Sequence, residues 1–213
     1  MQEVLAALLK ASAARHRHLC PRQVLGVRMG MRAAELLDLD LPQTGKRLFT
    51  FMETDGCALD GVSVATGCEV GRRSMRVLDF GLIAATFVDT QNGQAVRIRP
   101  ASHVRQAVSR YAGDAQDAWH AYLEAYQVMP SEELLEAQPV RLLVSLALIL
   151  SHEDAKASCE ACGEEIFNQR EVLVGGRVLC KACAGEAYVV PLGKPNRDSA
   201  SLQEVRVPCE MAP

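Results

Sequence analysis

The sequence predicts an α+β protein in two parts. Residues 1–150 contain both helical and strand patterns, including a hairpin around Gln91-Asn92-Gly93, which predicts a mixed helix/antiparallel-sheet domain. Two CxxC pairs lie seventeen residues apart and predict a small cysteine-bound module over residues 151–190. Residues 191–213 are rich in proline and polar side chains, so we expect a poorly structured tail.

Hydrophobic periodicity and turn residues place the elements of the first part. Helices are predicted at 3–14, 21–37, 58–66, 101–111 and 114–128, with a short helical turn at 132–137. Strands are predicted at 46–53, 77–88 and 94–99. Pro21 suits the first turn of its helix, and Gly67 is a natural stop. The apolar run 139–149 fits either a strand or a buried helix, because periodicity does not decide between them.

Composition and charge disfavour several classes of protein. The 213 residues are 49% hydrophobic and 23% charged with a net charge of −3, which disfavours a nucleic-acid binder. The longest apolar run, 142–150, falls far short of the roughly 20 residues that cross a bilayer. Glu3 and Lys10 argue against a signal peptide, so we expect a cytoplasmic protein. Its eight cysteines then indicate metal binding rather than disulfides.

The paired CxxC motifs carry the strongest signal in the chain. A glycine pair, Gly175-Gly176, predicts a hairpin between strands 171–174 and 177–179, with a helix starting near Lys181. This order is typical of a zinc-ribbon or treble-clef module. Four protein ligands make a closed site, so we expect structural zinc; redox cysteines or an iron centre are the alternatives. The ligands are Cys159, Cys162, Cys180 and Cys183.

A second cluster of metal-ligand side chains lies near the N-terminus. His16, His18 and Cys20 fall within five residues and are followed at once by Pro21. Imidazole nitrogen and thiolate sulfur suit zinc, iron, cobalt or copper rather than magnesium or calcium. The alternative is a loop before a helix, in which the histidines only form hydrogen bonds.

These motifs, with those that follow them, resemble the FmdE family, which takes its name from formylmethanofuran dehydrogenase. The matching residues run in order through His16, His18, Cys20, Pro21, Gly26, Gly30, Ala33, Glu53, Cys57, Asp60, Thr66, Gly67, Cys68, Gly71, Asp79, Gly81, Ala84 and Phe87. The resemblance implies an α+β N-terminal domain that is usually dimeric, and an association with molybdenum- or tungsten-dependent one-carbon and formate metabolism. Several members of the family also carry a C-terminal zinc finger.

Spacing limits which residues share one ion. Cys57 and Cys68 are eleven residues apart, which is about 16 Å along a straight helix, so both cannot bind the same ion. We therefore favour a three-ligand set of His16, His18 and Cys57, with an open fourth position for a second transition metal. Cys20 is the first substitute ligand, and Cys68 is expected at the rim. A metal-free thiol site is the alternative.

Acidic and basic side chains surround this predicted site in the sequence. Glu53 or Asp55 is placed to orient a ligand histidine. Four arginines stand where the resembled family usually has glycines or other residues, and they predict a small anionic ligand if their segments converge. A solvated basic face is the alternative. These arginines are Arg17, Arg22, Arg72 and Arg73.

Two functions from different classes follow. The first is an accessory or carrier protein that binds a metal or oxyanion for a molybdenum or tungsten oxidoreductase complex. The second is an enzyme that uses Cys57, His18, Cys20 or Cys68, as thiolate or through metal-bound water, on a small anionic substrate. A zinc-finger transcription regulator is disfavoured by the net charge. We expect a homodimer, formed through the 139–150 run and the Gly26/Gly30 face.

Overall fold

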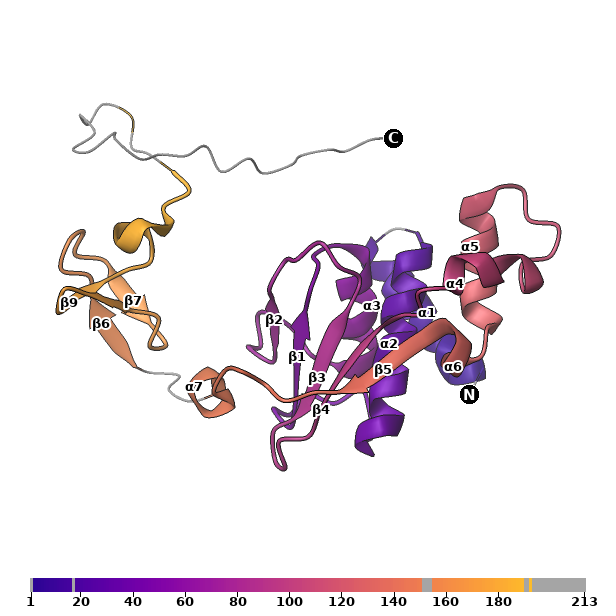
Figure 1. Cartoon of the computed structure of the whole chain (residues 1–213), viewed down its shortest axis with the longest axis horizontal. Helices are drawn as coiled ribbons and strands as arrows, with labels where there is room; N and C mark the ends of the chain where they lie inside the picture. Colours follow the sequence, from indigo (N-terminus) through magenta and orange to yellow (C-terminus); the bar gives the residue numbers. More distant parts are fainter. Residues whose placement is uncertain (1, 17, 151–154, 190–191, 193–213) are drawn as a thin grey trace. The chain divides into compact units, whose positions relative to one another are not determined.

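The computed structural model describes residues 2–16, 18–150, 155–189 and 192, in two compact units, Met1–Leu150 and Ser151–Pro213 (Figure 1). Both helices and a mixed sheet are present, which confirms the predicted α+β class. Among the described residues, no helix combines the length and apolarity needed to span a membrane. The predicted tail 191–213 lies outside the described residues, apart from Leu192.

A five-stranded sheet forms the centre of the N-terminal unit. Its strands are β1 (Leu48–Met52), β2 (Met75–Val77), β3 (Ala85–Asp89), β4 (Ala95–Pro100) and β5 (Leu135–Pro139), in the order β2-β1-β3-β4-β5. Strand β2 runs parallel to β1, and the other neighbours are antiparallel. Side chains of β1 alternate between two apolar clusters, one on each face of the sheet.

The predicted strand 77–88 is interrupted in the structure. Backbone N–H groups of Leu78, Phe80 and Leu82 donate to the carbonyls at the end of β1 instead of continuing the ladder. Asp79 and Gly81 have positive φ values of 47° and 69°, and this conformation breaks an extended strand. The prediction of one strand was therefore wrong, and the chain forms β2, a loop and β3.

Three helices pack on one face of the sheet: α1 (Gln2–His16), α2 (Pro21–Leu37) and α3 (Cys57–Thr66) (Figure 1). Helices α2 and α3 meet backbone to backbone. A Cβ atom on Gly26 would lie 2.1 Å from the Ala58 carbonyl oxygen, and one on Gly61 would lie 2.3 Å from that of Gln23. The glycines predicted to face a second copy of the chain therefore face α3, which corrects the expected dimer surface.

Shorter helices follow β4: α4 (Val104–Ala107), the 3₁₀ turn η1 (Val108–Arg110), α5 (Ala118–Val128) and α6 (Ser131–Leu134). The predicted helical turn 132–137 was wrong in its second half, where β5 pairs with β4. Buried Arg28 of α2 donates to the carbonyls of Tyr126, Gln127 and Met129. Its guanidinium thus supplies partners for the last carbonyls of α5.

The run 139–149 is neither one strand nor one helix. Helix α7 spans Leu146–Leu150, and the residues before it are irregular. Val140, Leu142, Leu146, Ile149 and Leu150 pack against the second face of the sheet, on Phe49, Phe51, Val88 and Ala95. Much of this run is therefore used within its own unit, while Leu143 and Val144 stay exposed.

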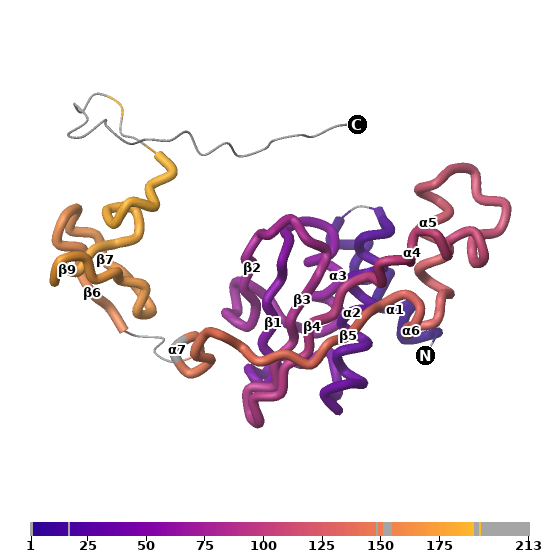
Figure 2. The backbone as a smooth tube through the Cα atoms, viewed as in Figure 1, coloured from indigo at the N-terminus to yellow at the C-terminus, as the bar shows by residue number. Residues whose placement is uncertain are grey.

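The C-terminal unit contains two small hairpins. Strand β6 (Lys156–Ser158) pairs with β7 (Glu165–Phe167), and β8 (Val172–Val174) pairs with β9 (Arg177–Leu179), as the tube in Figure 2 traces. Gly175 and Gly176 turn the second hairpin with positive φ values, as the sequence predicts. The helix predicted from Lys181 is a single π-type turn, η2 (Ala182–Glu186), because Gly185 has a φ of 111°.

Candidate metal centres

Four cysteines of the C-terminal unit converge on one point. Cys159 follows β6, Cys162 ends the first turn, Cys180 follows β9, and Cys183 lies in η2. All four sulfur atoms lie within 4.8 Å of one another. The Cys162 and Cys180 sulfurs are 3.9 Å apart, close to the roughly 3.8 Å edge of a tetrahedron with 2.3 Å Zn–S bonds. The residues fit zinc, which would tie the two hairpins together when bound.

Backbone N–H groups donate to sulfur atoms of this cluster and stabilise negative charge on them. The N–H of Cys180 donates to Cys159 Sγ at 3.3 Å, and the N–H of Cys183 donates to Cys180 Sγ at 3.4 Å. Backbone N–H groups, first that of Cys162 and then that of Cys180, lower the pKa of Cys159 to about 6. Hydrogen bonds with the other thiols, that of Cys180 first, raise the pKa of Cys183 to about 12. Near neutral pH Cys159 is therefore a thiolate and Cys183 a thiol, so a cation that binds both sulfurs must displace the Cys183 proton.

The N-terminal unit brings a histidine and a cysteine into direct contact. His16 is the last residue of α1, and Cys57 is the first of α3. His16 Nε2 lies 3.2 Å from Cys57 Sγ, and His16 Nδ1 lies 3.2 Å from Asp60 Oδ2. The carboxylate, imidazole and thiol form one continuous chain, in which Asp60 fixes the orientation of the imidazole.

The residue that orients His16 is not one of those we predicted. Glu53 is buried and forms two 2.6 Å hydrogen bonds with the Arg97 guanidinium on β4. Asp55 is exposed. Asp60 occupies the predicted place, and the sequence contains the signal for it. Asp60 lies three residues after Cys57, so in the predicted helix both fall on one face.

His18 and Cys20 lie beside this pair. The rings of His16 and His18 stand edge to face with their centroids 5.2 Å apart, and His18 is exposed. Cys20 directly precedes α2 and is only 7% exposed. Among the described residues, the four C-terminal cysteines alone bring three or more ligand atoms within 4.8 Å. The three-ligand set remains a prediction; His16 and Cys57 are the members in contact.

Burial controls the charge of Cys57. Loss of solvent, followed by the hydrogen bond with Cys20, raises the pKa of Cys57 to about 11. Arg22 opposes this shift through its charge but does not overcome it. The thiol is therefore protonated near neutral pH, and a proton must leave before its sulfur binds a cation.

The other predicted residues have different surroundings. Cys68 is 2% exposed and its thiol donates to the Leu48 carbonyl, which places it in the core rather than at the rim of a groove. Arg72 pairs with Glu69, and Arg73 has a φ of 60° in the same turn. Arg22 is exposed near Cys57, and Arg17 lies outside the described residues. Of the predicted arginines that the structure describes, Arg22 is the one whose charge acts on the Cys57 thiol.

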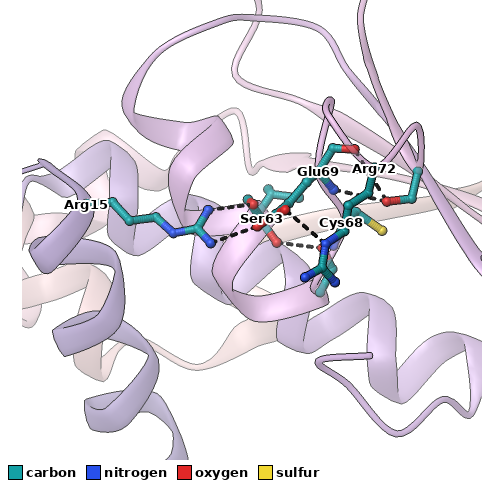
Figure 3. Close-up of polar contacts among 8 residues, drawn as sticks. Arg15, Ser63, Cys68, Glu69 and Arg72 are labelled. Atoms are coloured by element: carbon teal, nitrogen blue, oxygen red, sulfur yellow. Dashed lines mark hydrogen bonds and ion pairs between the residues drawn. The ribbon is translucent and has the colours of Figure 1, made fainter. Parts of the chain in front are cut away.

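A network that the sequence did not indicate fixes the end of α1. Arg15 reaches from α1 to Ser63 on α3 at 2.9 Å and to Glu69 at 3.0 Å, while Arg72 approaches the other oxygen of Glu69 (Figure 3). Because His16 follows Arg15 directly, this network holds the imidazole near the first turn of α3.

Comparison with known proteins now identifies the chain. Residues 15–136 match the family model described as FmdE, molybdenum formylmethanofuran dehydrogenase operon. The chain belongs to the FmdE family. Residues 156–188 match the prokaryotic dksA/traR C4-type zinc finger, which agrees with the four-cysteine cluster. The predicted family and zinc-binding module are thereby confirmed.

Two relatives of this FmdE protein extend the comparison. A curated Archaeoglobus fulgidus protein, named a probable S-adenosyl-L-methionine-binding protein, is 32% identical over 215 residues, covering 89% of this chain. The chain spans only 56% of that relative's length. The crystal structure of a tungsten formylmethanofuran dehydrogenase FmdE-like protein from Syntrophus aciditrophicus matches with a TM-score of 0.56 at 22% identity. That match covers 87% of this chain and 95% of the other, and it supports the fold.

Proposed function

We propose that this FmdE protein is a cytoplasmic accessory or carrier protein that binds a second transition metal at its N-terminal Cys/His site. It would serve molybdenum- or tungsten-dependent one-carbon metabolism, in contact with an oxidoreductase complex. The observation that carries the proposal is the 3.2 Å contact between His16 Nε2 and Cys57 Sγ, with Asp60 behind the imidazole. The metabolic context rests on the family description and on the name of the Syntrophus aciditrophicus protein.

The donor set supports a metal that exchanges ligands. Nitrogen and sulfur donors suit zinc or another late first-row transition metal. Asp60 holds His16 Nδ1, so that Nε2 is the nitrogen directed at Cys57. His18 and Cys20 are the adjacent candidates for further ligands. Two or three protein ligands leave room for a small anion, and exposed Arg22 adds positive charge beside Cys57.

An enzyme that uses the Cys57 thiolate is the alternative. Cys57, His16 and Asp60 are arranged like a nucleophilic cysteine, its base and a carboxylate that orients the base. The raised pKa of Cys57, about 11, leaves the metal-free thiol protonated near neutral pH, which disfavours a resting thiolate nucleophile. Steady turnover of a small anionic substrate by the metal-free protein would instead support the enzyme.

Cobalt(II) titration under anaerobic conditions tests the proposed open site. We expect a second cobalt(II) ion to bind to the wild-type chain after the C-terminal cluster is filled with zinc, with a sulfur-to-metal absorption band. Azide should change this spectrum by taking the open position. Cys57→Ala should lose the band, and Cys68→Ser, which changes a buried cysteine outside the site, should keep it. A cobalt spectrum that is identical in Cys57→Ala would contradict the proposal.

We also propose that the N-terminal unit forms a homodimer, through a surface other than the glycine face. Several exposed apolar side chains lie on edge strand β2 and on the segments before and after it, and we call them the β2 patch: Val70, Val77, Leu78, Phe80 and Leu82. Exposed apolar patches of this kind mark interaction sites. Light scattering should give a dimer for the wild-type chain and a 23.2 kDa monomer for Phe80→Asp. A wild-type monomer at micromolar concentration would refute the dimer.

A further inference from the structure

The last turn of α1 carries His16 but contributes no buried side chain. The buried residues of this helix are Leu9 and Ser12, and both precede residues 13–16. Ser12 accepts hydrogen bonds from the Gln23 amide of α2, at 2.9 Å through its carbonyl and at 3.1 Å through its hydroxyl. These contacts fix the body of α1, so its last turn needs other contacts to stay on α3.

Arg15 joins this last turn to α3 and to the segment after it. Its Nη1 donates to Ser63 Oγ at 2.9 Å, and its Nη2 donates to Glu69 Oε1 at 3.0 Å (Figure 3). Ser63 is only 3% exposed, which anchors the first contact in the N-terminal unit. Arg15 therefore reaches the helix whose first residue, Cys57, contacts His16.

Glu69 is shared between two arginines. Arg72 Nε lies 3.2 Å from Glu69 Oε2, whereas Arg15 uses Oε1. The side chains of Arg15 and Glu69 are 45% and 35% exposed. An ion pair with this exposure is screened by dissolved salt. The contact of Arg15 with Glu69 therefore weakens as the ionic strength rises.

Movement of the last turn would separate the two proposed metal ligands. His16 Nε2 lies 3.2 Å from Cys57 Sγ, and His16 Nδ1 lies 3.2 Å from Asp60 Oδ2. Asp60 orients the imidazole ring, whereas Arg15 holds the backbone that carries it. Since Arg15 and His16 are consecutive, a turn that leaves Ser63 and Glu69 also carries the imidazole away from Cys57.

We propose that Arg15 is a positioning residue for the N-terminal metal site. Its contacts with Ser63 and Glu69 form a latch that holds His16 beside Cys57. When the latch opens, the last turn of α1 unwinds and the site loses its imidazole ligand, so ionic strength regulates metal affinity. The link to metal rests on the proposed function, whereas the attachment of the turn does not.

Hydrogen–deuterium exchange, measured by NMR on the full-length chain with the N-terminal site free of metal, tests the latch alone. In Arg15→Gln, the amides of residues 13–16 should exchange about tenfold faster than in the wild type, because a hydrogen bond to a charged group is lost. Residues 5–12 should keep their protection, which shows that the variant is folded. Lys10→Gln removes a charge from an exposed position of the same helix and should exchange like the wild type.

Salt distinguishes the ionic latch from a general effect on folding. At 1 M KCl the screening length falls to about 3 Å, so residues 13–16 of the wild type should exchange nearly as fast as in Arg15→Gln. The variant has no latch to screen and should show no further increase. Equal exchange of residues 13–16 in the wild type and Arg15→Gln at low salt would overturn the latch.

Cobalt(II) titration measures the link between the latch and the metal site. Arg15→Gln and Glu69→Gln should each weaken the second ion about tenfold, the lower end of the effect of residues that act through a ligand. The double variant should bind this ion like Arg15→Gln, because both substitutions remove the same contact. Lys10→Gln should keep the wild-type affinity.

The contrary outcomes separate the two proposals. Faster exchange of residues 13–16 in Arg15→Gln with an unchanged cobalt(II) affinity would overturn the positioning role. A wild-type chain that binds no second ion would contradict the proposed metal site and with it the positioning role. The exchange rates would still decide whether Arg15 holds the last turn of α1.

Discussion

The two cysteine sites of this FmdE protein use sulfur in opposite ways. In the C-terminal cluster, four sulfurs lie within 4.8 Å of one another, and backbone amides lower the pKa of Cys159 to about 6. At the N-terminal site, one sulfur meets one imidazole, and burial raises the pKa of Cys57 to about 11. The first arrangement fills every position around a cation, whereas the second leaves positions for an outside ligand.

The two units also differ in the size of their apolar cores. The N-terminal unit has a large apolar core on one face of its sheet and a second cluster on the other. Among residues 155–189 of the C-terminal unit, the buried apolar cluster consists of Cys159, Ile166 and Leu179. We infer that packing stabilises the N-terminal unit without metal and that the C-terminal unit depends on its ion.

Metal removal should unfold the C-terminal unit and spare the N-terminal unit. Structural zinc sites contribute an apparent ~10–16 kcal/mol of binding free energy, which is also folding free energy. Chelation, or Cys180→Ala, should therefore unfold residues 155–189 while the N-terminal unit stays folded. Limited proteolysis measures both units at once. The exposed control Glu164→Gln should leave the pattern of the wild type, and an unchanged pattern in Cys180→Ala would contradict a structural ion.

Overpacking of the α2–α3 contact should destabilise the N-terminal unit and leave the C-terminal unit unchanged. A Cβ on Gly26 would lie 2.1 Å from the Ala58 carbonyl oxygen, so Gly26→Ala forces the two helices apart. Overpacking typically costs about 1–3 kcal/mol, and contact with backbone places this case at the upper end. Thermal melts should show the loss in the N-terminal unit alone. Gly71→Ala has open space around its Cβ and should melt like the wild type; equal melting of Gly26→Ala would show that the contact is not tight.

Local patterns in the sequence predict one site better than the other. Four cysteines in two close pairs specify their own cluster, because each CxxC turn brings its two sulfurs together. Cys57, His16 and Asp60 meet only after α1 packs on α3, and that depends on long-range contacts such as Arg15 with Glu69. Glu53 was a plausible partner for a histidine by sequence, but its pairing with Arg97 depends on the register of β3 and β4.

The elements of the fold likewise divide into those set by local sequence patterns and those set by long-range contacts. Helix α2 and strand β1 were predicted because each has a clear period and a clear start or stop. The break between β2 and β3 escaped prediction, since it arises from hydrogen bonds between the loop and the Met52 and Glu53 carbonyls. The apolar run 139–149 stayed ambiguous because contact with the second face of the sheet decides its conformation.

The Asp60 carboxylate, which contacts His16 Nδ1, should have a smaller effect, on the affinity of the N-terminal site for its metal ion. Loss of a partner that orients a ligand typically costs 10–100-fold in metal affinity. Asp60→Asn should weaken the second ion by this factor and leave the C-terminal ion unchanged. Competition with a fluorescent chelator gives both affinities. Asp55→Asn, at an exposed carboxylate, is the matched control, and an equal effect of the two substitutions would remove Asp60 from the site.

We propose that one chain holds two metal sites of different kinds, and a count of bound ions distinguishes this arrangement from a single site. Protein purified without oxygen or chelator should be analysed by elemental mass spectrometry as wild type, Cys57→Ala and Cys180→Ala. We expect two ions per wild-type chain and one in each variant, with zinc as the ion retained by Cys57→Ala. One ion in the wild type and an unchanged count in Cys57→Ala would contradict it.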